Sequence, residues 1–196
     1  MTRTKKTNVE KLDLKVARVA GKARKHPATR VVGTLSDVGD QPPLRTIAAM
    51  TMVAGALGRS PHLTGAGARM LVAHQLATMA KSVIKHAVDR TRPEVVLDGD
   101  RYESGKGHHD DPRFGSFPSG HTAGAVAVAR ALGRDYPPLA TPAMALAAGI
   151  AVAQVPRGKH YVSDVIAGAV IGLAADAVVA AVVRWLTASP PASPRT

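Results

Sequence analysis

Five apolar stretches, separated by proline, glycine or charged residues, constrain the fold of this chain more than any other feature. They cover residues 45–58, 67–85, 120–133, 139–156 and 162–186. Strand signals are weak, so the pattern predicts an all-α helical bundle. Because a bilayer-crossing helix needs roughly 20 apolar residues, we expect an integral protein of the cell membrane. It would be multi-pass, with about five spans.

Small residues indicate close packing of the last stretch. Gly168, Gly172 and Ala175 recur near one face of a helix, where small side chains let two helix backbones approach each other in lipid. Asp176 lies in the same stretch and should face another helix or a wet cavity. A mean hydropathy of +0.01 leaves a soluble bundle with alanine-rich core helices as the alternative.

The N-terminal part of the chain is polar and basic. Within residues 1–44, apolar positions occur at helical spacing: Val9, Leu12, Leu14, Val16 and Val19. We expect an amphipathic surface helix here, then a helical domain over 45–186 and a disordered tail over 187–196. The basic N-terminus predicts a cytoplasmic start, which with five spans puts the clusters described below on the cytoplasmic side. An outward-facing site is the alternative.

Charge and composition narrow the function. The formal net charge of +12 suits an anionic partner such as phosphate groups or an acidic lipid surface. Aromatic residues make up 3% of the chain, which argues against nucleic acid, because single-stranded bases bind by stacking on aromatic rings. The chain has no cysteine, which excludes a thiol nucleophile, a thiolate metal site and a disulfide framework.

Three clusters of polar residues carry the candidate chemistry. In the first, Lys85 and Arg92 are seven residues apart, about two turns of a helix. Both cations would therefore project from one face and flank a small anion, and Pro93 marks the end of that helix. A charged helix end at a membrane surface is the alternative interpretation.

The second cluster, Phe117-Pro118-Ser119-Gly120-His121, opens the stretch 120–133. Pro, Ser and Gly before an apolar helix indicate an N-cap, where unpaired backbone N–H groups bind an anion. A phosphate there would accept hydrogen bonds from the backbone and Ser119, with His121 placed to protonate a leaving oxygen. The alternative is an ordinary helix cap with a surface histidine.

The third cluster contains His160 and Asp164, four residues apart. A helix would put this carboxylate beside the imidazole. A carboxylate in that place fixes the histidine tautomer and frees the other ring nitrogen to attack. Taken by itself, the pair is also compatible with a structural ion pair.

In this order, the three clusters resemble the type 2 phosphatidic acid phosphatase (PAP2) family, which includes lipid phosphatases and vanadium-dependent haloperoxidases. The family pattern is K-x6-R-P, then P-S-G-H, then S-R-x5-H-x3-D. The chain matches the first two motifs in full and the third at His160 and Asp164, and the resemblance covers about residues 45–186.

The resemblance implies a role for each of these residues. His160 would attack phosphorus, Asp164 would orient it, and His121 would protonate the leaving group and later activate water. The phosphoryl oxygens would be held by cations and helix-end groups: Lys85, Arg92, Ser119 and the Gly120 backbone. Neither a metal nor a cofactor is implied.

The chain departs from the family pattern before the third histidine. Ala153-Gln154 stands where the family has Ser-Arg. Gln154 donates hydrogen bonds without charge, so Arg157, one helical turn along, is the candidate to replace the missing cation. If Arg157 does not reach the phosphate, a slow or inactive enzyme follows, because loss of a bidentate cation weakens transition-state stabilisation.

The loop over residues 94–117 is rich in possible metal ligands: Asp98, Asp100, Glu103, His108, His109, Asp110 and Asp111. Their spacing has no helical period, so we interpret the loop as solvated and beside the pocket mouth, with a metal site as the alternative.

The clusters and the apolar stretches together predict a membrane lipid phosphatase or pyrophosphatase that uses a phosphohistidine intermediate. Polyprenyl phosphates and phosphatidate-type lipids are the candidate substrates, and the lipid bilayer is the expected partner. Two alternatives stay open: a vanadate-dependent haloperoxidase and a non-catalytic protein that binds anionic lipid.

Overall fold

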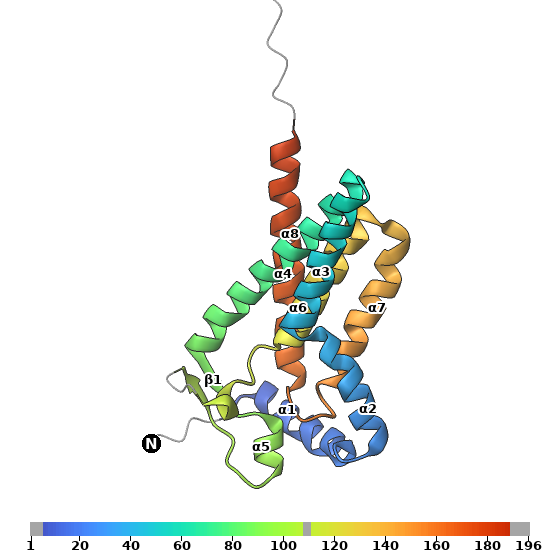
Figure 1. Ribbon diagram of the computed structural model, residues 1–196. Coiled ribbons are helices and arrows are strands. Elements are labelled where there is room, and N and C mark those ends of the chain that lie inside the picture. The colour runs from blue at the N-terminus through green and yellow to red at the C-terminus, as the bar shows by residue number, and fades with distance from the viewer. Residues whose placement is uncertain (1–5, 108–110, 189–196) are drawn as a thin grey trace, which may run out of the picture.

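Helices dominate the structure, a computed structural model that describes residues 6–107 and 111–188 (Figure 1). The elements follow one another in this order: α1 (Asn8–Ala20), η1 (Gly21–Ala23), α2 (Pro27–Ser36), η2 (Asp37–Gly39), α3 (Gln41–Leu57), α4 (Pro61–Ala87), β1 (Val88–Arg90), α5 (Pro93–Leu97), β2 (Ser104–Lys106), η3 (Pro112–Phe114), α6 (Gly120–Asp135), α7 (Pro137–Ala153) and α8 (Val162–Thr187). The predicted mostly helical fold is confirmed, with one small addition: β1 and β2 pair antiparallel.

Each of the five apolar stretches forms a helix, namely α3, α4, α6, α7 and α8. Local signals explain where they begin. Pro61 occupies the first turn of α4, and the Ser60 side chain caps that helix by accepting from the Leu63 N–H. Ser119 caps α6 in the same way at Thr122. Proline presets the helical φ angle, and a serine cap satisfies an N–H that the helix leaves free.

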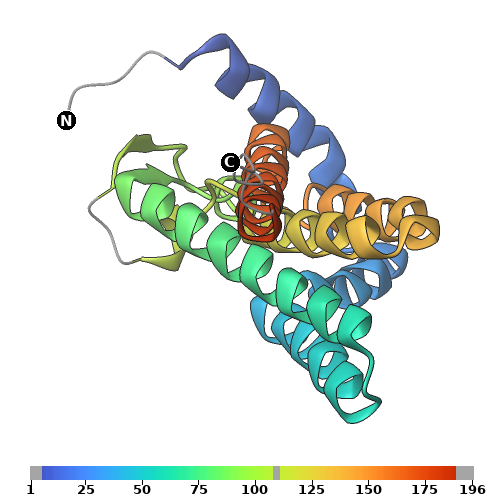
Figure 2. The same cartoon turned by 90° about the horizontal axis from the view of Figure 1, so that it is seen from above.

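Helix α6 lies at the centre, in contact with α3, α4, α7 and α8. Figure 2 shows the view down α8, with α4 and α6 beside it. A Cβ atom at Gly168 would lie 2.5 Å from the Ser119 carbonyl oxygen, and one at Gly172 would lie 2.6 Å from that of Ala123. The expected close approach of backbones along α8 is therefore confirmed, and its partner is α6.

The N-terminal part forms two helices, α1 and α2, instead of the single one that we expected. Both lie at the end of the bundle that carries β1 and α5 (Figure 1). On α1, Leu14 is buried, whereas Val9 and Leu12 are exposed. Asp13 is also buried, with 3% of its surface exposed, so α1 is anchored to the bundle through a charged side chain. The proposed division at residue 44 stays a prediction.

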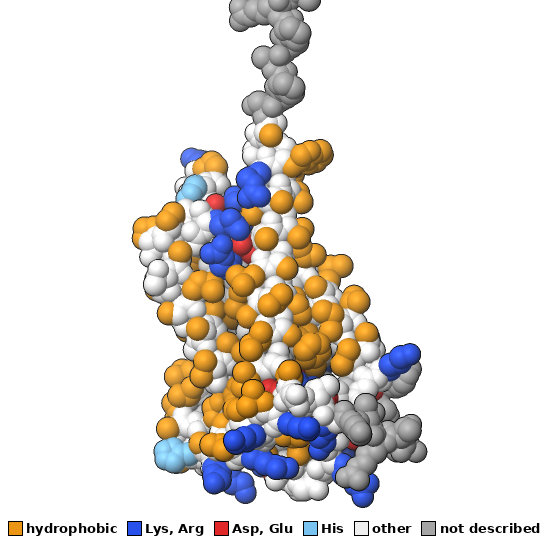
Figure 3. Space-filling view, turned by 180° about the vertical axis from the view of Figure 1, so that it is seen from behind, with side chains coloured by type: hydrophobic (Ala, Val, Ile, Leu, Met, Phe, Trp, Pro, Cys, Tyr) orange, Lys and Arg blue, Asp and Glu red, His pale blue; other side chains and the backbone are white. Residues whose placement is uncertain are grey.

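Within the described part of the chain, α8 is the single helix both long and apolar enough to cross a membrane, and α7 is a shorter apolar helix. Figure 3 shows hydrophobic side chains over the middle of one face, with Lys and Arg gathered at the end where the loops lie and in a second group toward the opposite end. Asp176 of α8 binds Arg134 of α6, with both carboxylate oxygens 2.8–3.0 Å from the guanidinium. Asp176 thus faces another helix, as expected, while the number of spans stays a prediction.

Candidate active site

The second and third clusters meet at one end of the bundle. Their histidines are 39 positions apart in sequence, yet the ring centroids of His121 and His160 are separated by 6.4 Å. His121 lies in the first turn of α6, and His160 lies in the loop that joins α7 to α8. At this separation, one tetrahedral phosphorus centre can contact both rings.

His160 is buried, with 4% of its surface exposed. Its Nδ1 donates a hydrogen bond to the Ser116 carbonyl oxygen at 2.6 Å, which leaves Nε2 as the unprotonated nitrogen of a neutral ring. Burial lowers the pKa of His160 well below its ordinary value, and the nearby positive charge of Arg92 lowers it further. The ring is therefore a neutral imidazole with a free nitrogen lone pair, as a nucleophile requires.

Asp164 does not orient His160 in the way that we expected. Its Oδ2 is 3.9 Å from His160 Nδ1, while Ser116 Oγ donates to the same oxygen at 2.5 Å. The expectation assumed one helix through both residues, but α8 begins at Val162, so His160 lies outside it. Asp164 thus acts on His160 indirectly, by fixing Ser116, whose carbonyl holds the ring.

Arg90 anchors this carboxylate, and sequence reasoning missed it. Its Nη1 lies 2.5 Å from Asp164 Oδ1, and its Nη2 lies 2.8 Å from Asp13 Oδ2. Ser163 Oγ completes the group by donating to Asp13. Although burial disfavours its charge, the two carboxylates raise the pKa of Arg90 above its ordinary value. The position of Arg90 inside the first motif was the only signal that could have identified it.

The two cations of the first cluster converge beside the loop that precedes α6, but not from one helix as we expected, because α4 ends at Ala87 and Pro93 begins α5. A Cβ atom at Gly115 would lie 3.0 Å from Lys85 Nζ and 3.6 Å from Arg92 Nη2. Arg92 is held in place because its Nε donates to the Pro112 carbonyl at 2.9 Å. Glycine at 115 therefore leaves room for two positive charges to approach one position.

A third cation, Lys81 of α4, lies beside the first residue of α6. A Cβ atom at Gly120 would lie 3.3 Å from Lys81 Nζ. Ser119 is fully buried, and its Oγ accepts from the Thr122 hydroxyl at 3.0 Å. The N-terminus of α6, with its free N–H groups and positive dipole end, thus faces added positive charge, which suits an anion. Sequence reasoning missed Lys81, although it precedes Lys85 by one helical turn.

Gln154 and Arg157 both contact the N-terminal part of the chain. Gln154 is fully buried, and its Nε2 donates to the Ile150 carbonyl at 3.0 Å and to Ser36 Oγ at 3.3 Å. Arg157 Nη1 lies 2.7 Å from Asp37 Oδ1 and 2.8 Å from Ser36 Oγ. Arg157, the candidate replacement cation, is therefore already paired with a carboxylate. The side-chain nitrogen of Gln154 is already hydrogen-bonded within the protein.

His121 contacts two carboxylates of the N-terminal part. Its Nε2 is 2.8 Å from Asp40 Oδ1 and 4.0 Å from Asp37 Oδ1. Among the described residues, Asp37, Asp40 and His121 form the one group whose possible metal-ligand atoms lie within 4.8 Å of one another. One member of this group, Asp37, already pairs with Arg157.

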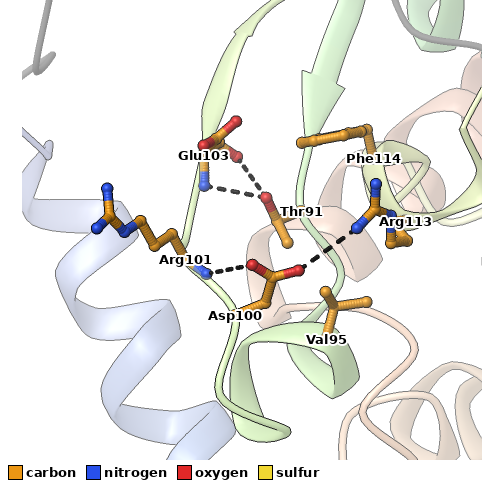
Figure 4. Close-up of a pocket in the computed structure, with 7 residues that line it drawn as sticks. All are labelled: Thr91, Val95, Asp100, Arg101, Glu103, Arg113 and Phe114. Carbon is orange, nitrogen blue, oxygen red and sulfur yellow. Dashed lines mark hydrogen bonds and ion pairs between the residues drawn. The ribbon is translucent and has the colours of Figure 1, made fainter. Parts of the chain in front are cut away.

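A separate pocket of about 180 Å³ lies among residues of the segment 91–114 (Figure 4). Its lining includes Thr91, Glu103 and Phe114, and Asp100 lies 3.6 Å from Arg113 across it. None of the predicted site residues lines this pocket. Two other described carboxylates of the loop also have cationic partners, since Asp98 pairs with Arg24 and Asp111 with Arg113. His108, His109 and Asp110 lie outside the described residues.

Comparison with known proteins agrees with the three motifs. Residues 66–188 match the PAP2 superfamily. Decaprenylphosphoryl-5-phosphoribose phosphatases from two strains of Mycobacterium tuberculosis are 35% identical over 118 residues, covering 58% of this chain and 57% of the relative. The chain thus matches just over half the length of these relatives.

Two solved structures share the fold. A transmembrane PAP2 type phosphatidylglycerolphosphate phosphatase from Bacillus subtilis aligns with a TM-score of 0.69 and 20% identity, covering 94% of this chain and 90% of the other. LpxE from Aquifex aeolicus aligns with a TM-score of 0.65 and 19% identity, covering 92% and 99%. Because the match over residues 66–188 takes in more than half of the chain and all three motifs, this protein belongs to the PAP2 superfamily.

Proposed function

We propose that this protein is a membrane lipid phosphatase or pyrophosphatase that works through a phosphohistidine and without a metal. The observation that carries the proposal is the pair of imidazoles 6.4 Å apart beside converging cations at a helix N-terminus. One ring is neutral with a free Nε2, which suits attack, and the other is near enough to transfer a proton to the same phosphoryl group.

In the first step, His160 Nε2 attacks phosphorus and the bond from phosphorus to the leaving oxygen breaks. His121 gives that oxygen a proton, so an alcohol or a phosphate departs and a phosphohistidine remains. In the second step, His121 takes a proton from water, the resulting hydroxide oxygen bonds to phosphorus, and the P–N bond breaks. Inorganic phosphate leaves and both histidines return to their starting forms.

Lys85, Arg92, Ser119 and the backbone N–H of Gly120 would hold the phosphoryl oxygens while negative charge shifts between them. Stabilisation of this kind is the main contribution that proteins make to phosphoryl transfer. Arg157, paired with Asp37, would add positive charge from beside His121. Asp164, through Ser116, would keep His160 in the tautomer that attacks.

The proposed substrates are polyprenyl phosphates and phosphatidate-type lipids. The relatives named for a decaprenyl-linked sugar phosphate favour the polyprenyl class. We further propose a multi-pass position in the cell membrane, with α3, α4, α6 and α7 crossing beside α8. Exposed apolar side chains along α3, α4, α7 and α8 support this arrangement; examples are Met50, Val72, Leu146 and Val170.

The test is phosphate release in detergent and EDTA from a polyprenyl phosphate, a polyprenyl diphosphate and a phosphatidate. We expect release by the parent protein, none by His160→Ala, and parent-like release by His86→Ala, which removes an exposed histidine of α4. Equal release by the parent and His160→Ala would defeat the mechanism. Tight binding of these lipids without turnover would instead support the non-catalytic alternative, for which the missing arginine at Gln154 is the motivation.

A further inference from the structure

We propose that Asp40 is a positioning residue for His121, so that the N-terminal part of the chain completes the active site. Asp40 lies outside residues 66–188, which match the family, and outside all three motifs. The role rests on the phosphatase activity proposed above, in which His121 supplies the proton for the leaving group.

The geometry places the Asp40 carboxylate on one specific atom. Asp40 Oδ1 is 2.8 Å from His121 Nε2. Asp40 precedes α3 at the N-cap position, but its side chain makes no capping hydrogen bond, so the carboxylate is available to the histidine. A Cβ atom at the preceding Gly39 would lie 2.5 Å from Ile150 Cγ2 and 3.6 Å from His121 Cβ. Only glycine lets this turn pass close enough to bring Asp40 to the ring.

The two carboxylates near His121 have different partners. Asp37 Oδ1 is 4.0 Å from His121 Nε2 and 2.7 Å from Arg157 Nη1. Its charge is therefore largely balanced by Arg157. Asp40 is the nearer carboxylate, and among the described residues no Lys or Arg forms an ion pair with it. Asp40 therefore carries the orienting interaction.

The pairing decides which nitrogen of His121 can serve the substrate. Because the Asp40 carboxylate contacts Nε2 as an ion pair, Nδ1 is the nitrogen left to give and take the reacting proton. His160 has the opposite arrangement, because its Nδ1 is held by the Ser116 carbonyl and Nε2 is free. Each imidazole thus contacts the protein through one nitrogen, His160 by a hydrogen bond and His121 by an ion pair, and has the other left for a shared phosphoryl group.

Charge also matters, since a general acid must begin protonated. Partial burial of His121 is the strongest influence against its charged imidazolium, and the positive charges of Arg157 and Arg92 also oppose it, whereas the negative charges of Asp40 and then Asp37 favour it. His160 is the other titratable group that faces the ring, at 6.4 Å. Loss of the Asp40 charge should therefore leave His121 unprotonated over more of the pH range.

The experiment compares two phosphate monoesters that have the same alkyl chain: an alkyl phosphate, and a nitrophenyl phosphate with the chain on its ring. The alkoxide needs a proton as the P–O bond breaks, whereas nitrophenolate departs without one. For Asp40→Asn we expect kcat/KM, which covers only the step that forms the phosphohistidine, to fall ~10–100-fold on the alkyl phosphate, a share of the ~100–10,000-fold that general acids contribute. On the nitrophenyl phosphate the loss should be under about threefold, and Asp40→Glu should recover part of the alkyl activity.

Asp98→Asn is the matched control, because it removes an exposed carboxylate that pairs with Arg24. It should behave as the parent on both substrates. EDTA is present throughout, so a stray cation at Asp37, Asp40 and His121 cannot cause the effect. Equal losses of Asp40→Asn on both substrates, or no loss on either, would overturn the proposal.

A second readout does not depend on turnover. Titration of the His121 ring by NMR, assigned with His121→Gln, should show its midpoint moved down by about one pH unit in Asp40→Asn, as expected for loss of a close opposite charge. An unmoved midpoint would refute the pairing even in an active enzyme. If the midpoint moves but the parent releases no phosphate, the pairing stands and the phosphatase function fails.

Discussion

Replacement of Arg90 by glutamine should be among the most damaging single changes in this protein. The guanidinium lies 2.5 Å from Asp164 and 2.8 Å from Asp13, and the exposed side-chain fractions are 6% for Arg90, 0% for Asp164 and 4% for Asp13. Glutamine removes the charge and leaves two carboxylates in a buried site without their cation.

Removal of one partner from a buried ion pair costs about 3–5 kcal/mol, because the remaining charge is left uncompensated. Arg90 has two such partners, but protonation of one carboxylate or entry of water would relieve part of the cost, so we expect a loss within ~3–5 kcal/mol. For a chain of this size, the loss corresponds to a fall in Tm of roughly 10 °C. Activity should fall as well, because Asp164 and Ser116 hold His160.

The assay is thermal unfolding of the detergent-solubilised protein, followed by circular dichroism. Arg113→Gln is the matched control, since Arg113 is 57% exposed and pairs with Asp111 at 2.7 Å. Exposed pairs of this kind contribute ~0–1 kcal/mol. The double replacement of Arg90 and Asp13 by leucine should recover part of the lost stability. A Tm for Arg90→Gln within the range of the control would refute this account of the buried network.

Two further predictions concern packing and pH. Gly172→Val should destabilise the fold by about 1–3 kcal/mol or more, because its Cβ would meet the Ala123 carbonyl at 2.6 Å. Gly65→Ala, with nothing within 4 Å of its Cβ, should leave Tm unchanged or higher. Equal Tm values for the two variants would contradict the packing of α8 on α6. The pKa of His160 is lowered in the folded protein. As pH falls below about 6.5, His160 therefore gains a proton in the unfolded chain but not in the folded protein. The free energy of unfolding should decrease as a result. His160→Gln should flatten this dependence in unfolding measured between pH 5 and 7, and an unchanged slope would show that the folded histidine is protonated.

The helices were predictable because their signals are local. A run of apolar residues between Pro, Gly and charges defines each helix within one stretch of sequence, and Ser60-Pro61 and Ser119-Gly120 mark two of the starts. Single-helix features were also predictable, such as the close-packing glycines Gly168 and Gly172. The second N-terminal helix was missed, since Pro27 was the main sign of its start.

The site was predictable only as far as the family motifs reach. They identify Lys85, Arg92, His121 and His160, but they do not show which atoms touch. The direct His160–Asp164 contact was expected from spacing, and the structure replaces it with the Ser116 carbonyl. Spacing predicts a contact only where both residues share one regular element, and His160 precedes the helix that contains Asp164.

The sequence by itself determined the number and length of the main helices, the family, and the chemical groups available for phosphoryl transfer. Only the tertiary structure decided that Asp13, Asp37 and Asp40 reach the site from the N-terminal part, and that Arg90 joins Asp13 to Asp164. These partners are 74 to 120 positions apart in sequence. Helix formation depends on neighbours within a few residues, whereas the pairing of distant charges depends on how the whole bundle brings them out of water together.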